Sequence, residues 1–403
     1  MKILEVNQHY WPENFRVTEI CETLAERGHD VTVLVGLPNY PTGIVPKEYK
    51  RFRNRRQERN GVHIRRCFEI GRKPGKIGLA INYVSFALSA TLKALFMKKD
   101  FDVIYSFSTS PVLMSLPGAI LKRITGKPLV IYVLDLWPAC LAIMNISPDS
   151  KFYRFMGKVS KWIYRQADVL LYSSKRFQQK MLDAHDIQMP DDHYLPQFAD
   201  EIFEITLPEK TFDGTYQFVF AGNVGKVQGL DVVMNAAAAL KEEPVHWHIV
   251  GDGSYLDECT ALVEQLAIQD HVTFHGRKPL EEMPAYYAMA DAMVVSVSDN
   301  ISINDTLPGK VQSYMAVGKP ILGTAGAETI CAIESAQCGY CSPADDTEAF
   351  VSIVRQFINE PEKHRQMGEN GQKYYYDHFT KKHHMDKLEQ IFNTLTQKQD
   401  LSE

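Results

Sequence analysis

The alternation of short apolar segments with helical segments is the feature that most limits how this chain can fold. Residues 3–6 and 31–35 are typical of strands, and a helix expected at 16–27 lies between them and ends at Gly28. Further strands are expected at 101–105, 129–134 and 167–173, and then at 216–221, 246–250, 272–275, 292–296, 321–322 and 339–341. Repeated strand–helix–strand units are typical of parallel, doubly wound sheets.

The length of the chain favours two such domains. Its 403 residues are too many for one compact core, and the alternation lapses at 196–208. We therefore predict an α/β fold with two Rossmann-like doubly wound domains facing a cleft. The first domain is expected over residues 1–200 and the second over residues 201–377. A last helix, at about 378–398, is expected to pack back on the first domain.

The sequence also suggests a compartment. The first residues are typical of a strand, and no apolar region followed by a cleavage site precedes it, so we expect no signal peptide. The seven cysteines are widely scattered, which suits a reducing cytoplasm. Cys338 and Cys341 form a lone C-x-x-C, which we expect in a buried strand and turn rather than in a redox or zinc site.

Charge is divided unequally between the two halves. Residues 1–200 hold 29 Lys and Arg against 19 Asp and Glu, a net charge of +10, whereas residues 201–403 hold 15 against 30, a net charge of −15. Most of the excess positive charge lies between residues 47 and 76. The charge-free stretch 77–92 follows it and is expected to be a helix with one narrow polar stripe. This helix either packs on the first sheet or, beside the basic residues, rests on anionic lipid.

Ligands of open α/β sheets bind beyond the carboxyl ends of the strands. The loops to consider are therefore those that follow the expected strands. They are residues 7–16, 106–111, 135–138, 222–229, 251–254, 276–279 and 299–310.

The segment 305–323 is typical of a loop, a helix at 311–317, a turn and a strand. Pro308 and Gly309 set the loop, and Gly318 ends the helix. Lys310 then precedes a helix N-terminus, whose free N–H groups favour an anion such as a diphosphate. The plain alternative is an ordinary helix-and-strand unit of any α/β domain.

A second loop, at residues 222–229, favours the same kind of anion site. Gly222, Gly225, Lys226 and Gly229 follow a strand and open a helix, a pattern that cradles phosphates or only allows tight packing. The spacing is neither that of a Walker A motif nor G-x-G-x-x-G. Together with Lys310, the lysine of this loop suits a diphosphate leaving group.

Polar residues of the first half follow strands in the same way. Asp135 ends an apolar strand, and it either accepts a proton, holds a sugar or acceptor hydroxyl, or caps the next segment. Asn14 and Arg16 either touch a ligand or cap the first helix, and Ser108 and Thr109 lie in the loop 106–111. No cluster of His, Cys and Asp has the spacing of metal ligands, so we predict no essential metal.

The chain resembles glycosyltransferases of the GT-B fold in retaining family 4 over nearly all of its length. The motifs that carry the resemblance are Leu24-Ala-Glu-Arg-Gly-His-Asp-Val-Thr-Val33, Asp135-Leu-Trp-Pro138, Ala221-Gly-Asn-Val-Gly225, Gln228-Gly-Leu230, Val250-Gly-Asp-Gly-Ser254, Phe274-His-Gly276, Leu307-Pro-Gly-Lys310 and Met315-Ala-Val-Gly-Lys-Pro320. Bacterial O-antigen and capsule transferases, and among them fucosaminyl (N-acetylfucosamine) transferases, are the most similar group. The first domain would then bind the acceptor, and the second the nucleotide-sugar donor.

The resemblance implies roles for particular residues. Asp135 and Lys310 would be catalytic, Lys310 at the departing diphosphate and Asp135 at the sugar and acceptor. The donor would be held by Gly222, Asn223, Gly225, Lys226, Gln228, Gly251, Asp252, Gly253, Arg277, Leu307, Pro308, Gly309 and Ser313. The acceptor would be held by Asn14, Arg16, Ser108 and Thr109.

The chain departs from the family pattern in two respects. Ser313 stands where the family has an acid that holds the ribose, and Asn223 and Gln228 replace the usual Arg and Lys of the phosphate loop. The positive charge at the diphosphate must then come from Lys226 and Lys310.

Three functions remain open at this point. The first is a metal-independent transferase that moves a sugar, such as N-acetylfucosamine, from a UDP-sugar to a polyprenyl-diphosphate-linked saccharide in surface polysaccharide synthesis, with retention. The others are a nucleotide-sugar epimerase and a catalytically silent nucleotide-sugar-binding protein. We expect no cofactor, no nucleic acid partner, and a cytoplasmic protein in peripheral contact with anionic membrane through its basic half.

Overall fold

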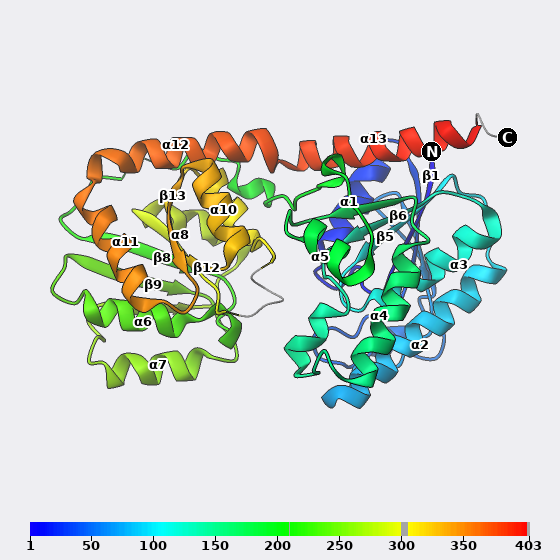
Figure 1. The fold of residues 1–403 in the computed structure, drawn as a ribbon, viewed down its shortest axis with the longest axis horizontal. Helices are drawn as coiled ribbons and strands as arrows, with labels where there is room; N and C mark the ends of the chain where they lie inside the picture. The colour runs from blue at the N-terminus through cyan, green and yellow to red at the C-terminus, as the bar shows by residue number, and fades with distance from the viewer. Residues whose placement is uncertain (209, 300–304, 401–403) are drawn as a thin grey trace. The chain divides into compact units, whose positions relative to one another are not determined.

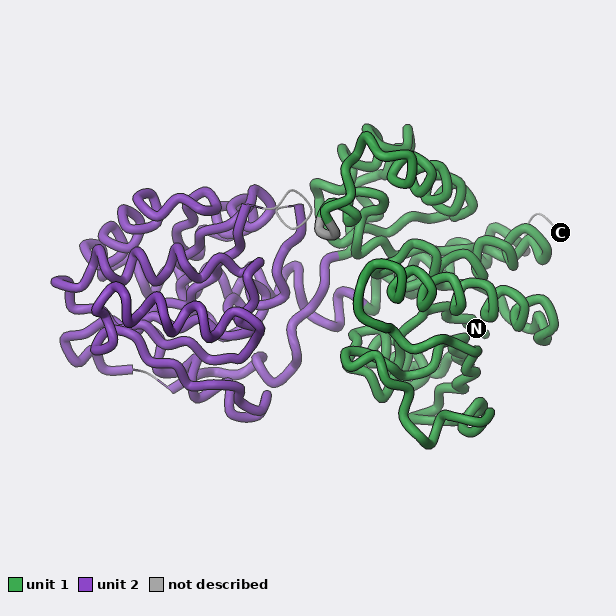
Figure 2. Tube along the Cα trace, turned by 90° about the horizontal axis from the view of Figure 1, so that it is seen from below, with its two compact units in different colours: residues 1–195, 385–403 green, residues 196–384 purple. Residues whose placement is uncertain are grey.

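The computed structural model describes residues 1–208, 210–299 and 305–400 of the chain. It forms two compact units, each with its own sheet (Figures 1 and 2). Unit 1 comprises residues 1–195 and 385–403, and unit 2 comprises residues 196–384. Each sheet is covered by helices in the manner of a Rossmann-like domain, so the predicted fold class is confirmed.

Unit 1 contains a seven-stranded sheet with the order β3-β4-β2-β1-β5-β6-β7. The strands are β1 (Lys2–Asn7), β2 (Asp30–Val35), β3 (Arg56–Arg59), β4 (Val62–Arg66), β5 (Val103–Ser108), β6 (Leu129–Val133) and β7 (Val169–Tyr172). All pairs are parallel except β3 with β4, a hairpin at one edge. The helices are α1 (Arg16–Glu26), α2 (Gly75–Phe96), α3 (Leu116–Thr125), α4 (Lys151–Tyr164) and α5 (Phe177–His185), with short 3-10 turns η1 (Lys47–Tyr49), η2 (Val112–Ser115), η3 (Ala139–Met144) and η4 (Asp191–His193).

Unit 2 contains a six-stranded, fully parallel sheet with the order β10-β9-β8-β11-β12-β13. The strands are β8 (Tyr216–Ala221), β9 (Val245–Val250), β10 (Val272–Gly276), β11 (Ala292–Ser296), β12 (Ile321–Ala325) and β13 (Gly339–Pro343). The helices are α6 (Leu230–Ala239), α7 (Leu256–Gln265), α8 (Met283–Met289), α9 (Gly309–Ala316), α10 (Ala327–Ala336), α11 (Thr347–Asn359) and α12 (Pro361–His378), with 3-10 turns η5 (Glu201–Phe203), η6 (Lys226–Gln228) and η7 (Leu280–Glu282).

Alternate residues of the central strands of unit 2 build cores on opposite faces of its sheet. Phe218 and Phe220 of β8 pack in one cluster with α6, α7 and α11. Val219 and Ala221 pack in another with α8, α9 and α10. Both faces of a parallel sheet are covered by its crossover helices, which explains why these strands are nearly uninterrupted apolar runs in the sequence.

The last helix, α13 (Lys381–Asp400), returns to unit 1 from Met385 onward. Its Phe392 is buried and packs edge-on against Tyr105 of β5, with ring centres 5.5 Å apart. On the surface of unit 1, Arg27 forms ion pairs with Asp386 and Glu389 at 2.7 and 2.5 Å.

Two local expectations about unit 1 were wrong. The basic stretch 47–76, in which no strand was predicted, contains β3 and β4, because its apolar signal is limited to alternate residues such as Val62 and Ile64. The strand expected at 101–105 instead covers Val103–Ser108. Ser106 lies inside that strand because its hydroxyl is satisfied in the core, by the carbonyl of Val6 at 3.0 Å and by Ser115 at 2.8 Å.

Candidate functional site

The sheet of unit 2 reverses its strand order between β8 and β11. The chain first builds β9 and β10 on one side of β8 and then crosses to the other side. Loops that leave neighbouring strands in opposite directions open a crevice at such a switch point. The loops that follow β8 and β11 meet here, since the N–H of Ser298 donates to the carbonyl of Val227 at 2.9 Å and the hydroxyl of Ser296 donates to that of Gly229 at 2.9 Å.

Backbone packing explains several of the glycines after β8 and β9. A Cβ on Gly251, whose φ is +153°, would lie 1.8 Å from the carbonyl oxygen of Gly222. A Cβ on Gly253 would lie 2.2 Å from the carbonyl oxygen of Val224. The loops are also hydrogen-bonded, with the Val224 N–H donating to the carbonyl of Asp252 at 3.0 Å. These glycines therefore have a structural reason, which is the close approach of two main chains.

Lys310 is the most unusual residue at this crevice. Its ammonium lies 3.7 Å from the centre of the Phe220 ring. A Cβ on Gly222 would lie only 2.9 Å from its Nζ, so the lysine tip lies directly over that glycine. The Nζ is buried and has no hydrogen-bond partner within the residues the structure describes. Burial lowers the pKa of Lys310 from its ordinary 10.5 to about 7.

The end of the loop expected at 299–310 is helical. Gly309 and Lys310 form the first turn of α9, because Pro308 at the N-cap, with φ −61°, is already set for a helix start. The loop expected at 299–310 is described only in part, since residues 300–304 lie outside the described residues. Within the part that is described, Leu307 is half-buried against the core of unit 2.

Helix α9 is fixed to the end of β8 by Tyr314. Its buried hydroxyl accepts from the N–H of Ala221 and donates to the carbonyl of the same residue, both at 3.1 Å. The preceding residue, Ser313, is buried, and its hydroxyl donates to the carbonyl of Gly309, one turn earlier, at 3.4 Å. The N-terminus of α9 is thereby held beside the loop after β8.

The two glycine-loop side chains expected at the phosphates differ in their surroundings. Lys226 is exposed in the 3-10 turn η6. The side-chain carbonyl of Gln228 accepts from the N–H of Gly225 at 3.1 Å and from the amide of Asn223 at 3.3 Å. Gln228 thus braces the loop from within, which explains why a glutamine serves at this position.

Two more predicted donor residues follow other strands. Asp252 is exposed, and its carboxylate accepts from the N–H of Gly253 at 2.7 Å. Arg277 is exposed after β10, which is two strands away from β8. Lys310, Gly222 and the first turn of α9 are the residues that the structure brings together most closely.

Unit 1 has its own switch point, between β1 and β5. Next to it, the loops after β5 and β6 are joined. The indole N–H of Trp137 donates to the Ser110 hydroxyl at 3.1 Å, and the Leu134 N–H donates to the carbonyl of Ser108 at 3.0 Å. Asp135 lies between these contacts. Burial raises its pKa, and hydrogen bonds from Ser110 partly offset that effect.

The other predicted acceptor residues are placed less uniformly. Asn14 is exposed before α1, and Arg16 begins that helix and pairs with Glu19 at 2.6 Å. Thr109 is half-buried in the loop after β5, where its hydroxyl contacts the sulfur of Met114 at 3.7 Å. Ser108, expected in the same loop, is instead the last residue of β5 and fully buried. The loop begins later than predicted because β5 pairs with β6 as far as Ser108 and Val133.

Sequence reasoning missed a buried polar network at the carboxyl ends of β1, β2 and β4. Glu69 accepts hydrogen bonds from the amides of Gln8, Asn39 and Asn82 at 2.6–3.0 Å, and burial raises its pKa to about 8. Nearby, Glu13 accepts from two N–H groups of the loop after β2, both at 2.6 Å. Part of the signal was present in the sequence, because Gln8 and Asn39 each follow an expected apolar strand. Glu69 follows β4, which was not predicted, and the contacts that connect these residues span long sequence separations.

Within the described part of the chain, no group of three or more His, Cys, Asp or Glu residues could hold a metal ion. Asp100 and Asp102, which precede β5, both contact Lys2 instead. Asp100 pairs with its ammonium at 2.8 Å, and Asp102 accepts from its backbone N–H at 2.7 Å. Both aspartates lie at the amino-terminal ends of β1 and β5, whereas a switch-point crevice opens at the carboxyl ends.

Two family models match the chain, one in each half. The description "Glycosyl transferase 4-like domain" matches residues 14–196, and "Glycosyl transferases group 1" matches residues 203–374. The second match contains the loops after β8 and β11 and the whole of α9, and the first contains Asp135.

Individual relatives agree with the family models. The chain is 26% identical to WbjE of Pseudomonas aeruginosa, named as a glycosyltransferase, over 69% of this chain and 70% of the relative. It is 25% identical to WcaI of Escherichia coli (strain K12), named for glycosyl transfer in colanic acid biosynthesis, over 90% of this chain and 93% of the relative. Among solved structures, Alr3699/HepE of Anabaena in complex with UDP matches 98% of this chain and 100% of its own, with a TM-score of 0.69 and 16% identity, which shows a shared fold.

Proposed function

The chain belongs to the group 1 glycosyltransferases of the GT-B fold, with a glycosyl transferase 4-like N-terminal half, and on that premise we propose its reaction. It transfers a sugar from a UDP-sugar to a lipid-linked saccharide in the synthesis of a surface polysaccharide. The sugar proposed is an N-acetylated amino sugar such as N-acetylfucosamine, moved with retention of its configuration.

The observation that carries this proposal is the buried, unpaired ammonium of Lys310. An unpaired buried charge is costly, so a folded protein retains one where a ligand completes it. The ligand must be an anion, and it must reach the end of β8 beside Gly222. A nucleotide diphosphate fits, because Lys310 lies in the first turn of α9, and the free N–H groups of a helix start also favour phosphate.

The chemistry follows from this position. When the bond between the anomeric carbon and the diphosphate oxygen breaks, negative charge grows on the departing diphosphate. Lys310 and the N-terminus of α9 are already in place to stabilise that charge, so no solvent has to reorganise around it during the reaction. The acceptor hydroxyl forms the new bond, and its proton passes to Asp135 or to the departing diphosphate. The raised pKa of Asp135 makes it a better proton acceptor than an ordinary aspartate.

The nucleotide and the acceptor are proposed on separate grounds. UDP is supported by HepE of Anabaena, which has the same fold and was solved with UDP and with UDP-glucose. A saccharide acceptor is supported by the polar loops after β1, β2, β5 and β6 in unit 1, which offer hydroxyls, amides and carboxylates to sugar hydroxyls. If a polyprenyl diphosphate anchors that acceptor, the protein works in the cytoplasm at a membrane surface. The proposed reaction uses no metal and no other cofactor.

One assay tests the reaction and separates it from the two alternatives. The purified protein is incubated with a panel of UDP-sugars, with and without a polyprenyl-diphosphate-linked saccharide, and released UDP is measured. Release that depends on the acceptor supports transfer. An altered free sugar formed without acceptor would identify an epimerase, and UDP binding with no release under any condition would identify a silent binding protein.

A further inference from the structure

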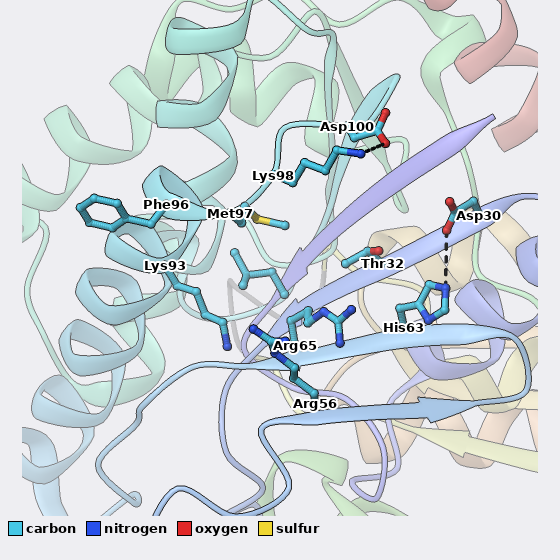
Figure 3. Close-up of a pocket in the computed structure, with 11 residues that line it drawn as sticks. Asp30, Thr32, Arg56, His63, Arg65, Lys93, Phe96, Met97, Lys98 and Asp100 are labelled. Carbon is cyan, nitrogen blue, oxygen red and sulfur yellow. Dashed lines mark hydrogen bonds and ion pairs between the residues drawn. The ribbon is translucent and has the colours of Figure 1, made fainter.

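A pocket lies in unit 1, along one face of β2 and β4 near the hairpin edge of the sheet. Its volume is about 530 Å³. It is lined by residues of β2, of the hairpin of β3 and β4, of the last turn of α2 and of the segment that follows α2 (Figure 3). None of its lining residues is among those assigned to the two half-sites described above.

Positive charges converge in this pocket from three elements. Arg56 of β3 and Arg65 of β4 are direct partners in the antiparallel register, and like charges placed opposite each other destabilise a hairpin. Lys93 of α2 reaches toward them (Figure 3). Burial lowers the pKa of Lys93, and the neighbouring arginines lower it further. The arrangement therefore costs stability unless an anion lies among the three cations.

The two carboxylates that line the pocket, Asp30 and Asp100, contact residues other than these three cations. Asp100 pairs with Lys98 at 2.7 Å and with Lys2 at 2.8 Å. Asp30 lies 3.9 Å from His63. Within the described residues, Arg56, Arg65 and Lys93 have no carboxylate partner, although the Lys93 ammonium donates to the carbonyl of Arg66 at 2.6 Å. The missing counter-charge must come from another molecule.

The helix that ends at this pocket has a bare apolar face. Its opposite face, with Phe86, Ala90 and Ala94, is packed in the core of unit 1. The bare face consists of large apolar side chains at helical spacing, with Leu88 63% and Phe96 83% exposed. Its members are Ile77, Ile81, Val84, Leu88, Leu92, Leu95 and Phe96. Within the described residues, α2 is the one helix long and apolar enough to cross a membrane, but its packed face holds it against the sheet.

The bare face and the pocket adjoin, because Phe96 is a member of both. A large exposed apolar surface marks an interaction site. Apolar side chains beside unpaired cations complement the interface of an anionic bilayer, where acyl chains lie next to phosphates. The charges of the pocket therefore favour an anionic bilayer as the partner that covers the bare face of α2.

We propose that the pocket of Arg56, Arg65 and Lys93 holds the phosphate of an anionic phospholipid headgroup, while the bare face of α2 lies in the interface of the same bilayer. This inference deepens the proposed function and rests on it in one respect, since a lipid-linked acceptor would be presented at such a surface. It does not depend on which sugar is transferred.

The test is vesicle binding by the full chain without donor or acceptor. Vesicles of phosphatidylcholine with phosphatidylglycerol are compared with vesicles of phosphatidylcholine alone. The variant Arg56→Gln with Arg65→Gln removes two pocket charges. Each cation at an anionic surface contributes about fivefold in affinity, so this variant should bind more than about tenfold more weakly.

Matched variants decide whether the pocket itself is responsible. Lys50→Gln with Arg53→Gln removes the same charge from exposed residues of the same basic stretch, outside the pocket. It should weaken binding by less than about threefold, because exposed distant charges are screened. Equal losses of vesicle affinity in the two double variants would overturn the proposed role of the pocket. Leu88→Gln should also weaken vesicle binding, and unchanged binding would overturn the role of α2.

Two further outcomes would give these cations a different role. Arginines on an edge strand also prevent strand pairing between molecules, and that role alone predicts no preference for anionic vesicles. If inorganic phosphate binds the wild type as tightly as the vesicles do, and the pocket variant loses it, the ligand is a soluble anion and the lipid proposal is wrong. Circular dichroism verifies that each variant is folded, and UDP release with a detergent-solubilised acceptor reports separately on the proposed reaction.

Discussion

The ammonium of Lys310 lies 3.7 Å from the centre of the Phe220 ring, which joins the first turn of α9 to the apolar core at the end of β8. The ring face offers the cation a weak partner, and nothing in the described residues offers it a strong one. A cation in these surroundings is costly to bury, and an anion that reached it would relieve that cost.

Replacing Lys310 should separate stability from function. Lys310→Met keeps most of the volume and removes the buried charge, so the ligand-free protein should gain about 1–3 kcal/mol in the free energy of unfolding. Acceptor-dependent UDP release should fall by more than about tenfold, because the leaving-group charge is no longer stabilised. Urea unfolding and the UDP-release assay measure the two effects. Lys226→Gln, which removes an exposed lysine from the neighbouring loop, serves as control and should leave stability unchanged. A Lys310→Met protein with wild-type turnover would exclude the proposed role.

The pKa of Lys310 predicts how UDP affinity depends on pH. Free protein has a pKa of about 7 at this residue, against an ordinary 10.5, and a bound diphosphate raises it again. Above pH 7 the lysine must take up a proton to bind, so the dissociation constant of UDP should rise by up to about tenfold per pH unit from pH 7 to 9. Calorimetric titrations over this range measure it. Lys310→Met should show a flat profile, and the same slope in that variant would assign the proton to another group.

The same shift predicts how stability depends on pH in the ligand-free protein. The unfolded chain keeps its Lys310 proton to about pH 10, whereas the folded chain loses it near 7. Unfolding therefore takes up a proton in this window, and the free energy of unfolding should rise with pH between about 7 and 10. The cost of burial is fully present below pH 7. Denaturant unfolding of wild type and Lys310→Met across this range should show the difference between them shrinking as pH rises.

Asp135 should act on transfer rather than on the nucleotide. Asp135→Asn keeps the size and the contacts near Ser110 but removes the proton acceptor, so turnover should fall by about 10²-fold or more. The affinity for UDP should stay within about twofold, because the residues proposed to hold the nucleotide lie in unit 2 and Asp135 lies in unit 1. Steady-state kinetics and UDP titration measure both. Loss of UDP binding in this variant would move Asp135 to the donor side.

Gly251 should be required for folding of unit 2. Gly251→Ala places a Cβ 1.8 Å from the carbonyl oxygen of Gly222, at a φ of +153° that alanine avoids. The loops after β8 and β9 must then separate, which should cost about 2–4 kcal/mol of stability. Thermal unfolding measures this loss. Gly276→Ala is the matched control, since its φ is also positive but its Cβ would have no neighbour within 4 Å. Equal losses would show that backbone conformation, rather than the close approach, dominates.

Local patterns in the sequence were sufficient for the fold class and for singling out the loops of the proposed donor half-site. Alternating apolar strands and helices require doubly wound sheets, since each strand buries both faces. The glycines at 222, 251 and 253 and the Pro308 start of α9 are likewise readable, because turns and helix starts depend on neighbours in sequence. These features are sufficient to single out the loops after β8 and β11.

The tertiary structure alone decided the state of the side chains. The burial of Lys310 depends on Phe220 and Gly222, some ninety residues away, and the network around Glu69 joins four separate segments. The convergence of Arg56, Arg65 and Lys93 depends on a hairpin whose strands were not recognised in the sequence. Burial and electrostatic environment arise from contacts between distant segments, and a pattern of neighbouring residues does not contain them. The sequence by itself therefore determined the strands, the helix starts and the glycine loops, and the folded chain determined which charges lack a partner.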